Sequence, residues 1–486
     1  MYRKGSITVY LSLTLAVLLS LTATALYSVQ LAGARVQAVH GADQGLYSLF
    51  ARYDVPVLER YHLFLLDGSF GQGSLQMGQV YSILEKDTAD NLNGGNGIIK
   101  KVKLKNGSIT GYTLATDNGG NAVKAQAVAY METVLGVQGV RSLAEKVQGQ
   151  EETVQVIEAK KDEIKEDEAF AQYEALKNQN QEQTVPEESL QGAVPIPEDF
   201  VNPIEEVKAA KGKGILTLAV PQGKEISAAV QAKASMVSGR TLEKGMGVPA
   251  YDSSCDTWTA DLMFNEYLMR HFGCFTEMKS DPGLQYQLEY ILQGKESDLE
   301  NLKGVVNRLL LIREASNLLY LYQDEGKRAQ AQMTALILAS LFGAPQGAKA
   351  LEPVLLVCWA FGESVLDLRE LLDGGKVPLM KSDSSWQLSV TDLPKFLQGA
   401  DALRKEQEDG LEYKDYLRIL LLMKDSEDKT VRCMDMMEMA IRGEPGKEQF
   451  RLDCCLYAAQ IQFAFEAEGS IRYEARRSFG YDMGGV

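Results

Sequence analysis

The sequence predicts an α+β protein that is predominantly helical, with one N-terminal transmembrane helix. The body is expected to be a helical bundle with β-hairpins near residues 98–115 and at the C-terminus. Three observations predict this fold class. No charged residue stands between Lys4 and Arg35. Apolar residues recur at helical spacing through most of residues 262–441. Residues 98–115 and 456–475 instead alternate with period two, which is typical of half-buried strands.

The uncharged N-terminal run is 30 residues long, and about 20 apolar residues suffice to cross a bilayer as a helix. Arg3 and Lys4 precede it with no acidic neighbour. The tendency of positive charge to stay inside predicts a cytoplasmic N-terminus and an extracytoplasmic body. We therefore expect residues 1–6 to be a cytoplasmic basic leader and residues 7–32 a transmembrane helix. The predicted location is the cell membrane, in single-pass form.

The sequence allows three possible N-termini of the mature chain. A secretory signal peptide would be cut after Ala25, because Ala23-Thr24-Ala25 fits a small-x-small cleavage site. A pilin-type leader would be cut after Gly5, so that Ser6 becomes the first residue of the mature chain. The third reading is a chain intact from Met1. Apolar and small residues continue past Ala25 without a turn-forming break, which favours a retained membrane helix.

Small side chains recur every four residues along the predicted membrane helix. Such a face lets two helices approach closely in lipid, so it indicates helix packing and self-association through the membrane segment. The alternative is that Ser, Thr and Ala are simply common in weakly apolar membrane helices. The five positions are Ser12, Ala16, Ser20, Thr24 and Ser28.

Composition excludes several classes of partner. The chain has 50 Lys and Arg against 66 Asp and Glu, a formal net charge of -16. Nucleic acid is not an expected partner, because binding to phosphates needs a basic surface. The same charge argues against broad adsorption to an anionic membrane face. Six cysteines are too few for a disulfide framework in a body of this size. One disulfide between Cys255 and Cys274 is left open.

The body is expected to have three regions. Residues 33–149 are predicted to form a membrane-proximal α+β region, in which Asn106-Gly107 marks a hairpin turn. Residues 150–203 read as an acidic helical stalk or coiled coil, followed by a Pro-containing linker. Residues 204–486 are predicted to be a mainly helical extracytoplasmic domain that closes with a β-hairpin. Because two strands alone are marginally stable, that hairpin needs a partner sheet, and residues 98–115 are the candidate. The apolar run 215–220 is expected to be a strand.

Motifs for catalysis are missing. The sequence contains no HExxH, GxSxG, P-loop or GxGxxG pattern, so we expect neither an enzyme nor a cofactor. Asp67-Gly68-Ser69-Phe70-Gly71 follows an apolar strand and is similar to the Asp-x-Ser-x-Ser metal site of von Willebrand A domains. Asp67 and Ser69 would be the metal ligands, whereas Gly71 removes a third. A strand end with a Gly-rich turn is the favoured reading.

Three charged residues stand among apolar neighbours in the helical region: Arg308, Arg313 and Glu363. A buried Glu–Arg pair between two helices is costly unless its hydrogen bonds are satisfied, and it can fix the register of the helices. We therefore interpret these residues as structural polar contacts rather than catalytic groups.

The N-terminal stretch Gly5 to Phe50 resembles the TadE/TadG-like proteins of tight-adherence (Tad/Flp) pilus systems. In those proteins a Gly leader precedes the membrane helix and an Ala-Asp-bearing helix follows it. Here Gly5-Ser6-Ile7-Thr8-Val9-Tyr10-Leu11 and Ala34-Arg35-Val36-Gln37-Ala38-Val39-His40-Gly41-Ala42-Asp43 carry the resemblance. Tyr10 stands where TadE-type pseudopilins have Glu, which points to the TadG-like branch.

The body contains the stretches Leu310-Leu311-Ile312-Arg313-Glu314-Ala315-Ser316-Asn317, Trp359-Ala360-Phe361-Gly362-Glu363-Ser364, Val377-Pro378-Leu379-Met380-Lys381 and Tyr413-Lys414-Asp415-Tyr416-Leu417-Arg418. With these among its motifs, nearly the whole chain resembles the domain of unknown function 5702, a family of clostridial membrane-anchored proteins. The acidic segment 150–203 is the least similar part. The family resembles TadE/TadG products and is often associated with Tad-type loci.

Both resemblances imply a non-enzymatic component of a Tad-like pilus or secretion apparatus. Its expected partners are the lipid bilayer and other envelope or pilus-assembly proteins. A metal-dependent adhesion module of von Willebrand A type is the alternative function. An extracytoplasmic hydrolase is the third, and the missing nucleophile–base motif counts against it.

Overall fold

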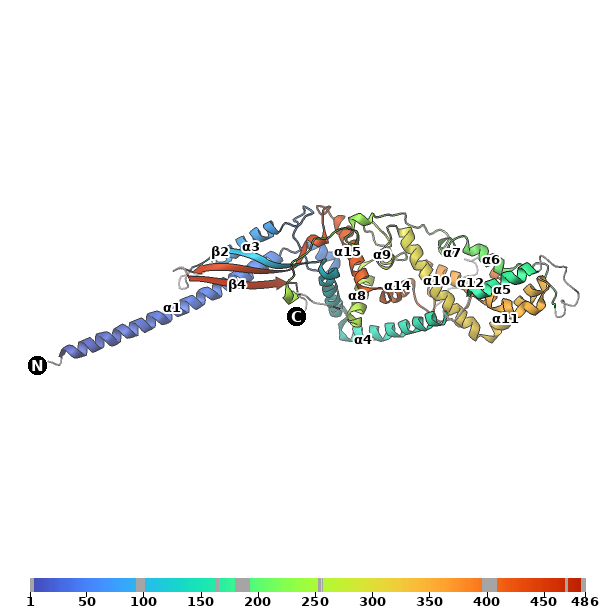
Figure 1. The fold of residues 1–486 in the computed structure, drawn as a ribbon, viewed down its shortest axis with the longest axis horizontal. Coiled ribbons are helices and arrows are strands. Elements are labelled where there is room, and N and C mark those ends of the chain that lie inside the picture. The colour runs from blue at the N-terminus through green and yellow to red at the C-terminus, as the bar shows by residue number, and fades with distance from the viewer. Residues whose placement is uncertain are drawn as a thin grey trace. The chain divides into compact units, whose positions relative to one another are not determined.

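The structure is a computed structural model of the 486-residue chain. It describes residues 4–92, 101–161, 166–179, 193–251, 255, 257–395, 409–467 and 471–481. The chain is α+β and predominantly helical, as predicted, and it divides into two compact units (Figure 1). Unit 1 consists of Met1–Tyr130, Ala234–Asp256 and Met434–Val486. Unit 2 consists of Met131–Lys233 and Thr257–Cys433.

Unit 1 is built on an antiparallel sheet whose central strand is β3 (Cys455–Ala467). One edge of β3 pairs with β2 (Val102–Leu114) along nearly its whole length. The other edge pairs with β4 (Ile471–Gly480) and, beyond it, with the two-residue strand β1 (Leu66–Asp67). The predicted C-terminal hairpin and its predicted partner segment are both confirmed. Its turn, residues 468–470, lies outside the described residues.

The predicted hairpin turn at Asn106-Gly107 is wrong, because β2 passes through both residues as one strand. Asn106 pairs with Ala464 and Gly107 with Phe463, after a register shift that follows Leu104. A Cβ atom on Gly107 would lie 1.9 Å from Cδ1 of Phe463. The glycine is therefore needed for close packing under an aromatic ring rather than for a turn.

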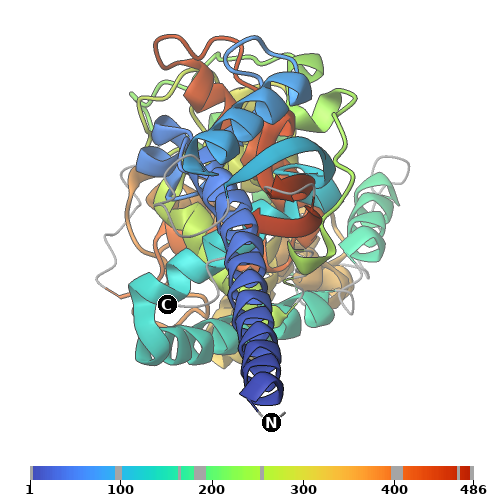
Figure 2. The same cartoon turned by 90° about the vertical axis from the view of Figure 1, so that its left-hand side faces the viewer.

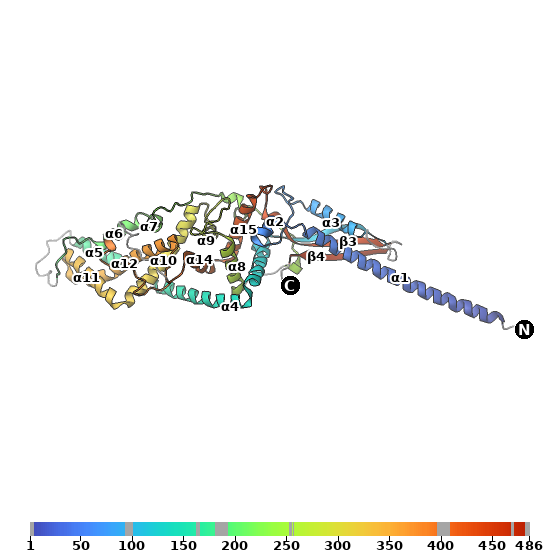
Figure 3. The same ribbon diagram turned by 180° about the vertical axis from the view of Figure 1, so that it is seen from behind.

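Two helices cover one face of this sheet, α1 (Lys4–Phe50) and α3 (Met77–Leu92) (Figures 1 and 3). Figure 2 shows α1 running on past the sheet toward its N-terminus. The apolar core of unit 1 lies between the helices and the strands, where Val80, Leu84, Ile461, Phe463 and Phe465 are buried. The short helix α2 (Val55–Tyr61) follows α1, with Asp54 accepting a hydrogen bond from the backbone N–H of Val57 at its start.

Unit 2 is a helical bundle centred on α10 (Asp298–Gln323) and α12 (Ala348–Asp373). Almost every residue of α12 from Leu351 to Leu372 is buried, as expected of a central helix. The buried residues include the charged side chains of Glu363 and Asp367. The other α-helices among its described residues are α5 (Glu166–Gln179), α6 (Pro203–Lys211), α7 (Ile215–Ala219), α8 (Trp258–His271), α9 (Gln287–Gln293), α11 (Glu325–Leu341) and α14 (Tyr413–Leu422). Two further helices belong partly to each unit, α4 (Asn121–Lys161) and α15 (Ser426–Arg442).

Several expectations about the body need correction. Within the acidic stretch, α5 does not project as a stalk or coiled coil, because it packs on α12 and its Tyr173 is fully buried. The predicted strand at residues 215–220 is the short helix α7. Part of the Pro-containing linker, residues 180–192, lies outside the description, as do residues 1–3 of the leader.

The division of the chain also departs from the expected boundaries at residues 149, 203 and 204. The closing hairpin belongs with the membrane-proximal region, because β3 forms its ladder with β2. The acidic stretch instead belongs with the helical body, because α5 and α6 bury their apolar faces against α12.

Candidate functional site

The first half of α1 is an apolar helix that lies exposed in the structure. Its large side chains are exposed along the whole stretch, for example Leu11 at 65%, Leu18 at 58% and Leu26 at 66%. Among the described residues, α1 alone is long and apolar enough to cross a membrane, with a segment of mean hydropathy 2.0 and no buried residue. We call residues 7–31 the exposed half of α1. Folded proteins rarely leave so large an apolar patch in water.

The small residues predicted as a packing face all lie on the exposed half. Ser12, Ala16, Ser20, Thr24 and Ser28 are exposed there. Two of their hydroxyl groups donate to the helix itself, Ser12 to the carbonyl of Val9 at 2.9 Å and Thr24 to that of Ser20 at 2.8 Å. These polar groups are therefore satisfied inside the helix, as an apolar environment requires. Gly5 and Ser6 lie in its first turns.

The second half of α1 is part of the core of unit 1. Ala34, Ala38 and Ala42 recur every four residues and are all buried. Glycines extend this small-residue surface against α3: a Cβ atom on Gly41 would lie 2.6 Å from Cδ2 of Leu92, and one on Gly45 would lie 2.1 Å from Oγ1 of Thr88. The two helices thus approach closely because small residues line the contact. We call residues 34–50 the packed half of α1.

Polar and aromatic contacts hold the packed half against β4. The Asp43 carboxylate accepts two hydrogen bonds from the Arg477 guanidinium, at 2.5 and 2.9 Å, and this hydrogen bonding raises the pKa of Arg477. Phe50 packs against the rings of Phe479 and Tyr481. The Ala-Asp stretch is therefore the docking surface of α1 on its sheet.

The turn at Asp67 and Ser69 uses its own polar atoms. Oδ1 of Asp67 accepts hydrogen bonds from the backbone N–H and the hydroxyl of Ser69, at 2.9 and 2.6 Å. The backbone N–H of Gly71 donates to the Ser69 hydroxyl at 3.3 Å. This arrangement closes a strand end with a Gly-rich turn. Among the described residues no group of three or more His, Cys, Asp or Glu could hold a metal ion.

A buried charge network occupies the middle of unit 2. Lys381 contacts Oε1 of Glu363 at 2.5 Å and Oδ1 of Asp367 at 2.7 Å. Arg313 donates to Oδ2 of Asp367 at 3.0 Å. The side chains of all four residues are fully buried. Burial raises the pKa of Glu363, whereas Lys381 and Arg313 outweigh burial at Asp367 and lower its pKa.

This network joins segments that are far apart in the sequence. Arg313 also donates to the carbonyls of Pro378 and Leu379 and to the hydroxyl of Tyr416, at 2.9 to 3.1 Å. All four stretches quoted above for the resemblance of the body to family 5702 contribute residues here. Because its charges balance and its donors are engaged, the arrangement fixes helix positions rather than presenting a reactive group.

The structure separates the three residues predicted as structural contacts. Arg313 and Glu363 belong to the network, but each pairs with a residue that the sequence did not single out, Asp367 and Lys381. Arg308 lies outside this network. It is exposed on α10, where it lines a groove of about 420 Å³ with Leu311 and Lys424.

One further carboxylate of unit 2 is unusual. Glu289 on α9 is fully buried, and its Oε1 accepts hydrogen bonds from the backbone N–H of Phe275 and the hydroxyl of Tyr413, both at 2.8 Å. Burial raises the pKa of Glu289 to about 7. Asp298 adds a smaller repulsion.

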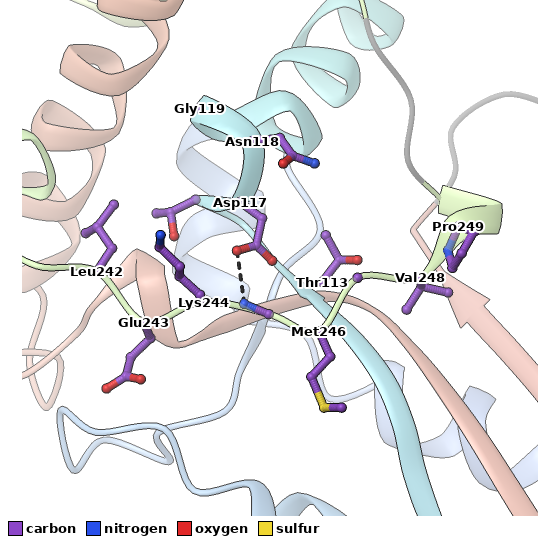
Figure 4. A pocket seen from close by; sticks show the side chains of 13 residues that line it. Thr113, Asp117, Asn118, Gly119, Leu242, Glu243, Lys244, Met246, Val248 and Pro249 are labelled. Atoms are coloured by element: carbon purple, nitrogen blue, oxygen red, sulfur yellow. Dashed lines mark hydrogen bonds between the residues drawn. The ribbon is translucent and has the colours of Figure 1, made fainter.

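A cavity of about 710 Å³ lies in unit 1 between the end of β2 and the loop 242–249 (Figure 4). Asp117 fastens the loop, accepting hydrogen bonds from the backbone N–H groups of Leu114 at 2.8 Å and Gly245 at 3.0 Å. The carboxylate is thus committed to backbone donors. No His or Cys is present among the residues that line the cavity. Its ionisable side chains are Asp117, Glu243 and Lys244, and we assign the cavity no chemistry.

The cysteines are free thiols, including Cys255 and Cys274, so the structure forms no disulfide between them. Burial raises the pKa of the Cys274 thiol to about 11, which makes it a poor nucleophile.

Comparison with known protein families assigns residues 196–467 to one family. No curated protein and no solved structure matches it. Residues 196–467, more than half of the chain, match the family described as a family of unknown function, DUF5702. They include α10, α12, α14 and the central strand β3, and thus the buried charge network. The chain belongs to the DUF5702 family.

Proposed function

We propose that this protein is a non-enzymatic, single-pass membrane protein with an extracytoplasmic body, and a structural or assembly component of a Tad-like pilus or secretion system. The observation that carries the proposal is the division of α1. One continuous helix has an exposed apolar half followed directly by a half that is built into a folded unit.

This division supports a retained anchor. The exposed half contains 25 residues, which at about 1.5 Å per residue span roughly 37 Å, more than the roughly 30 Å of a bilayer's hydrocarbon core. The helix runs unbroken through Ala23-Thr24-Ala25. Arg3 and Lys4 before the span favour a cytoplasmic N-terminus, so both units would lie outside the cytoplasm.

The Tad-like assignment rests on the resemblance of the N-terminus. Its Ala-Asp-bearing helix has a physical role in this chain, because Ala34, Ala38 and Ala42 pack in the core and Asp43 pairs with Arg477. A helix fixed to its sheet in this way would transmit force between the membrane and the body. That property suits a component of a filament or of its assembly machinery. The adhesion alternative gains no support, since Oδ1 of Asp67 is bound within its own turn.

Membrane insertion is tested with charges placed in the two halves of α1. Leu18→Arg/Leu19→Arg puts two cations at the centre of the span, each costing about 2.5–3.5 kcal/mol on insertion. We expect this variant to leave the membrane fraction. The matched control Val36→Arg/His40→Arg changes two exposed positions of the packed half and should stay in membranes. Equal membrane retention of both variants would contradict the anchor.

The pilus assignment is tested by partners. Crosslinking in native cells, followed by purification of the full chain in detergent, should recover Tad-type platform or pilin-like proteins. Genes for a Tad-type ATPase, a platform protein and a prepilin peptidase should lie near its gene. The absence of all three genes, together with recovery of unrelated envelope proteins only, would contradict the assignment while leaving the anchor standing.

A further inference from the structure

The open face of the sheet in unit 1 is basic, although the chain as a whole carries a net charge of -16. This is the face opposite α1 and α3. The strand register places Lys103, Glu466 and Arg472 side by side on β2, β3 and β4. Glu466 is 3.0 Å from Lys105. The exposed cations of this face are Lys101, Lys103, Lys105, Arg472 and Arg476, and its carboxylates are Glu466 and Glu474.

The cations gather at one end of the sheet, which we call the tip, formed by the start of β2, the end of β3 and the start of β4. The hydroxyl of Tyr473 donates to the carbonyl of Leu31 at 3.4 Å, which sets the level of the tip along α1. Leu31 is the last residue of the exposed half. Arg472 is the neighbour of Tyr473 on the side toward the strand start, so its cation lies at the same level. Figures 1 and 3 show the strand ends lying beside α1 on this side.

This level coincides with the lipid headgroups if α1 is anchored as proposed above. A span that starts at Ile7 reaches the far end of the roughly 30 Å hydrocarbon core before Leu31, and the headgroup layers extend the bilayer to about 40–45 Å. Cations at the level of Leu31 then stand within the headgroup layer. Electrostatic attraction acts over a Debye length of about 8 Å at physiological salt, so only charges this close contribute.

The tip cations are available for such contacts. Within the described part of the chain, Lys101, Lys103 and Arg472 form no ion pair, whereas Lys105 is paired with Glu466. Because the remainder of the chain is acidic, an anionic membrane surface would attract the tip and repel the rest of the body.

Resting on the proposed membrane anchor, we propose that the basic tip of the sheet binds the headgroups of anionic lipids around α1. The contact adds a second attachment beside the helix and sets the orientation of unit 1 on the membrane. The partner is an anionic phospholipid such as phosphatidylglycerol, recognised through its phosphate by lysine and arginine side chains.

The test uses the full-length protein in nanodiscs of phosphatidylcholine alone or of phosphatidylcholine mixed with phosphatidylglycerol. Lysine reactivity toward a water-soluble acylating reagent is measured site by site by mass spectrometry. We expect Lys101 and Lys103 to react several-fold more slowly in the anionic discs. Lys303 and Lys349, exposed in unit 2, serve as internal controls and should react equally in both. At 1 M salt, where the Debye length falls to about 3 Å, the difference should shrink.

A double variant isolates the role of the neighbouring cations. Lys101→Gln/Arg472→Gln should weaken the protection of Lys103 in anionic discs, whereas the control Lys303→Gln/Lys349→Gln should leave it unchanged. Equal reactivity of Lys103 in the two lipid compositions, or protection that survives the double variant, would overturn the inference. Failure of the protein to remain in discs of either composition would instead overturn the proposed anchor.

Discussion

The two units hold their central helices in place by opposite means. In unit 1, α1 is positioned by the absence of side chains, because Gly41 and Gly45 let α3 approach closely. In unit 2, α10 and α12 are positioned by four fully buried charges. Overpacking a close apolar contact costs about 1–3 kcal/mol, whereas removing one partner of a buried ion pair costs about 3–5 kcal/mol. We therefore expect that the loss of a single contact lowers the free energy of unfolding of unit 2 more than that of unit 1.

Removing one charge of the buried network should have the largest effect. Lys381→Met replaces the lysine with a neutral, unbranched side chain. Arg313 is then the sole cation of the network beside Glu363 and Asp367. We expect the free energy of unfolding of unit 2 to fall by about 3–5 kcal/mol. All three tryptophans, Trp258, Trp359 and Trp386, lie in unit 2, so denaturation followed by tryptophan fluorescence reports this unit alone.

Two variants control this measurement. Lys349→Met removes an exposed lysine from the start of α12 and should change the stability by less than about 0.5 kcal/mol. Adding Glu363→Gln to Lys381→Met restores the charge balance and should recover part of the loss. A Lys381→Met protein as stable as the Lys349→Met control would show that the network does not organise unit 2.

The next largest effect is expected at Glu289, which should make the stability of unit 2 depend on pH. Its folded-state pKa of about 7 exceeds the usual 4.5, so the folded unit binds more protons between these values. Stability therefore falls as the pH rises through this window. Glu289→Gln cannot ionise and should be more stable above pH 7, by up to about 3 kcal/mol. The exposed control Glu145→Gln should keep the wild-type dependence of stability on pH. If Glu289→Gln also kept it, Glu289 would not have a raised pKa in the folded unit.

The close helix contact of unit 1 should be more tolerant. Gly45→Val drives a side chain into Thr88, and overpacking of this kind costs about 1–3 kcal/mol. Hydrogen exchange of the packed half of α1, read by mass spectrometry, should become faster. Gly78→Ala in α3 is the matched control, because an added Cβ meets no heavy atom within 4 Å. Equal exchange in the two variants would mean that α1 and α3 do not pack at this point.

The ion pair of unit 1 should matter least. Asp43 and Arg477 are partly exposed, with 18% and 43% of their side-chain surface accessible. Asp43→Ala should weaken the protection of the packed half by only about 0.2–1 kcal/mol, and less at high salt. A loss of stability as large as that caused by Lys381→Met would contradict the expected difference between the two units.

The sequence could predict the features that depend on local pattern. The uncharged run predicted the apolar helix that forms the exposed half of α1. The period-two stretches predicted the positions of β2 and the C-terminal hairpin. It could not show that Asn106-Gly107 lies inside a strand, because the need for a glycine there comes from Phe463 across the ladder. The five-residue helix α7 was mistaken for a strand, since so short an apolar run fits both structures.

The buried network was only half predictable. Arg313 and Glu363 stood out because charged residues among apolar neighbours are conspicuous, but Arg308 stood out equally and is exposed. Lys381 was missed because Ser382 and Asp383 follow it, whereas Asp367 was missed although it stands between two leucines. A useful signal was available in Asp367, which follows Glu363 by four residues and so shares its helix face. Only the fold shows that Lys381 reaches this face.

The most direct test of the anchor is the mature N-terminus of the protein, measured by mass spectrometry on material purified from the membranes of its native cells. The anchor predicts a chain that begins at Met1 or at Ser6 and retains the whole exposed half of α1. A chain that begins at Leu26, recovered from the soluble fraction, would contradict it.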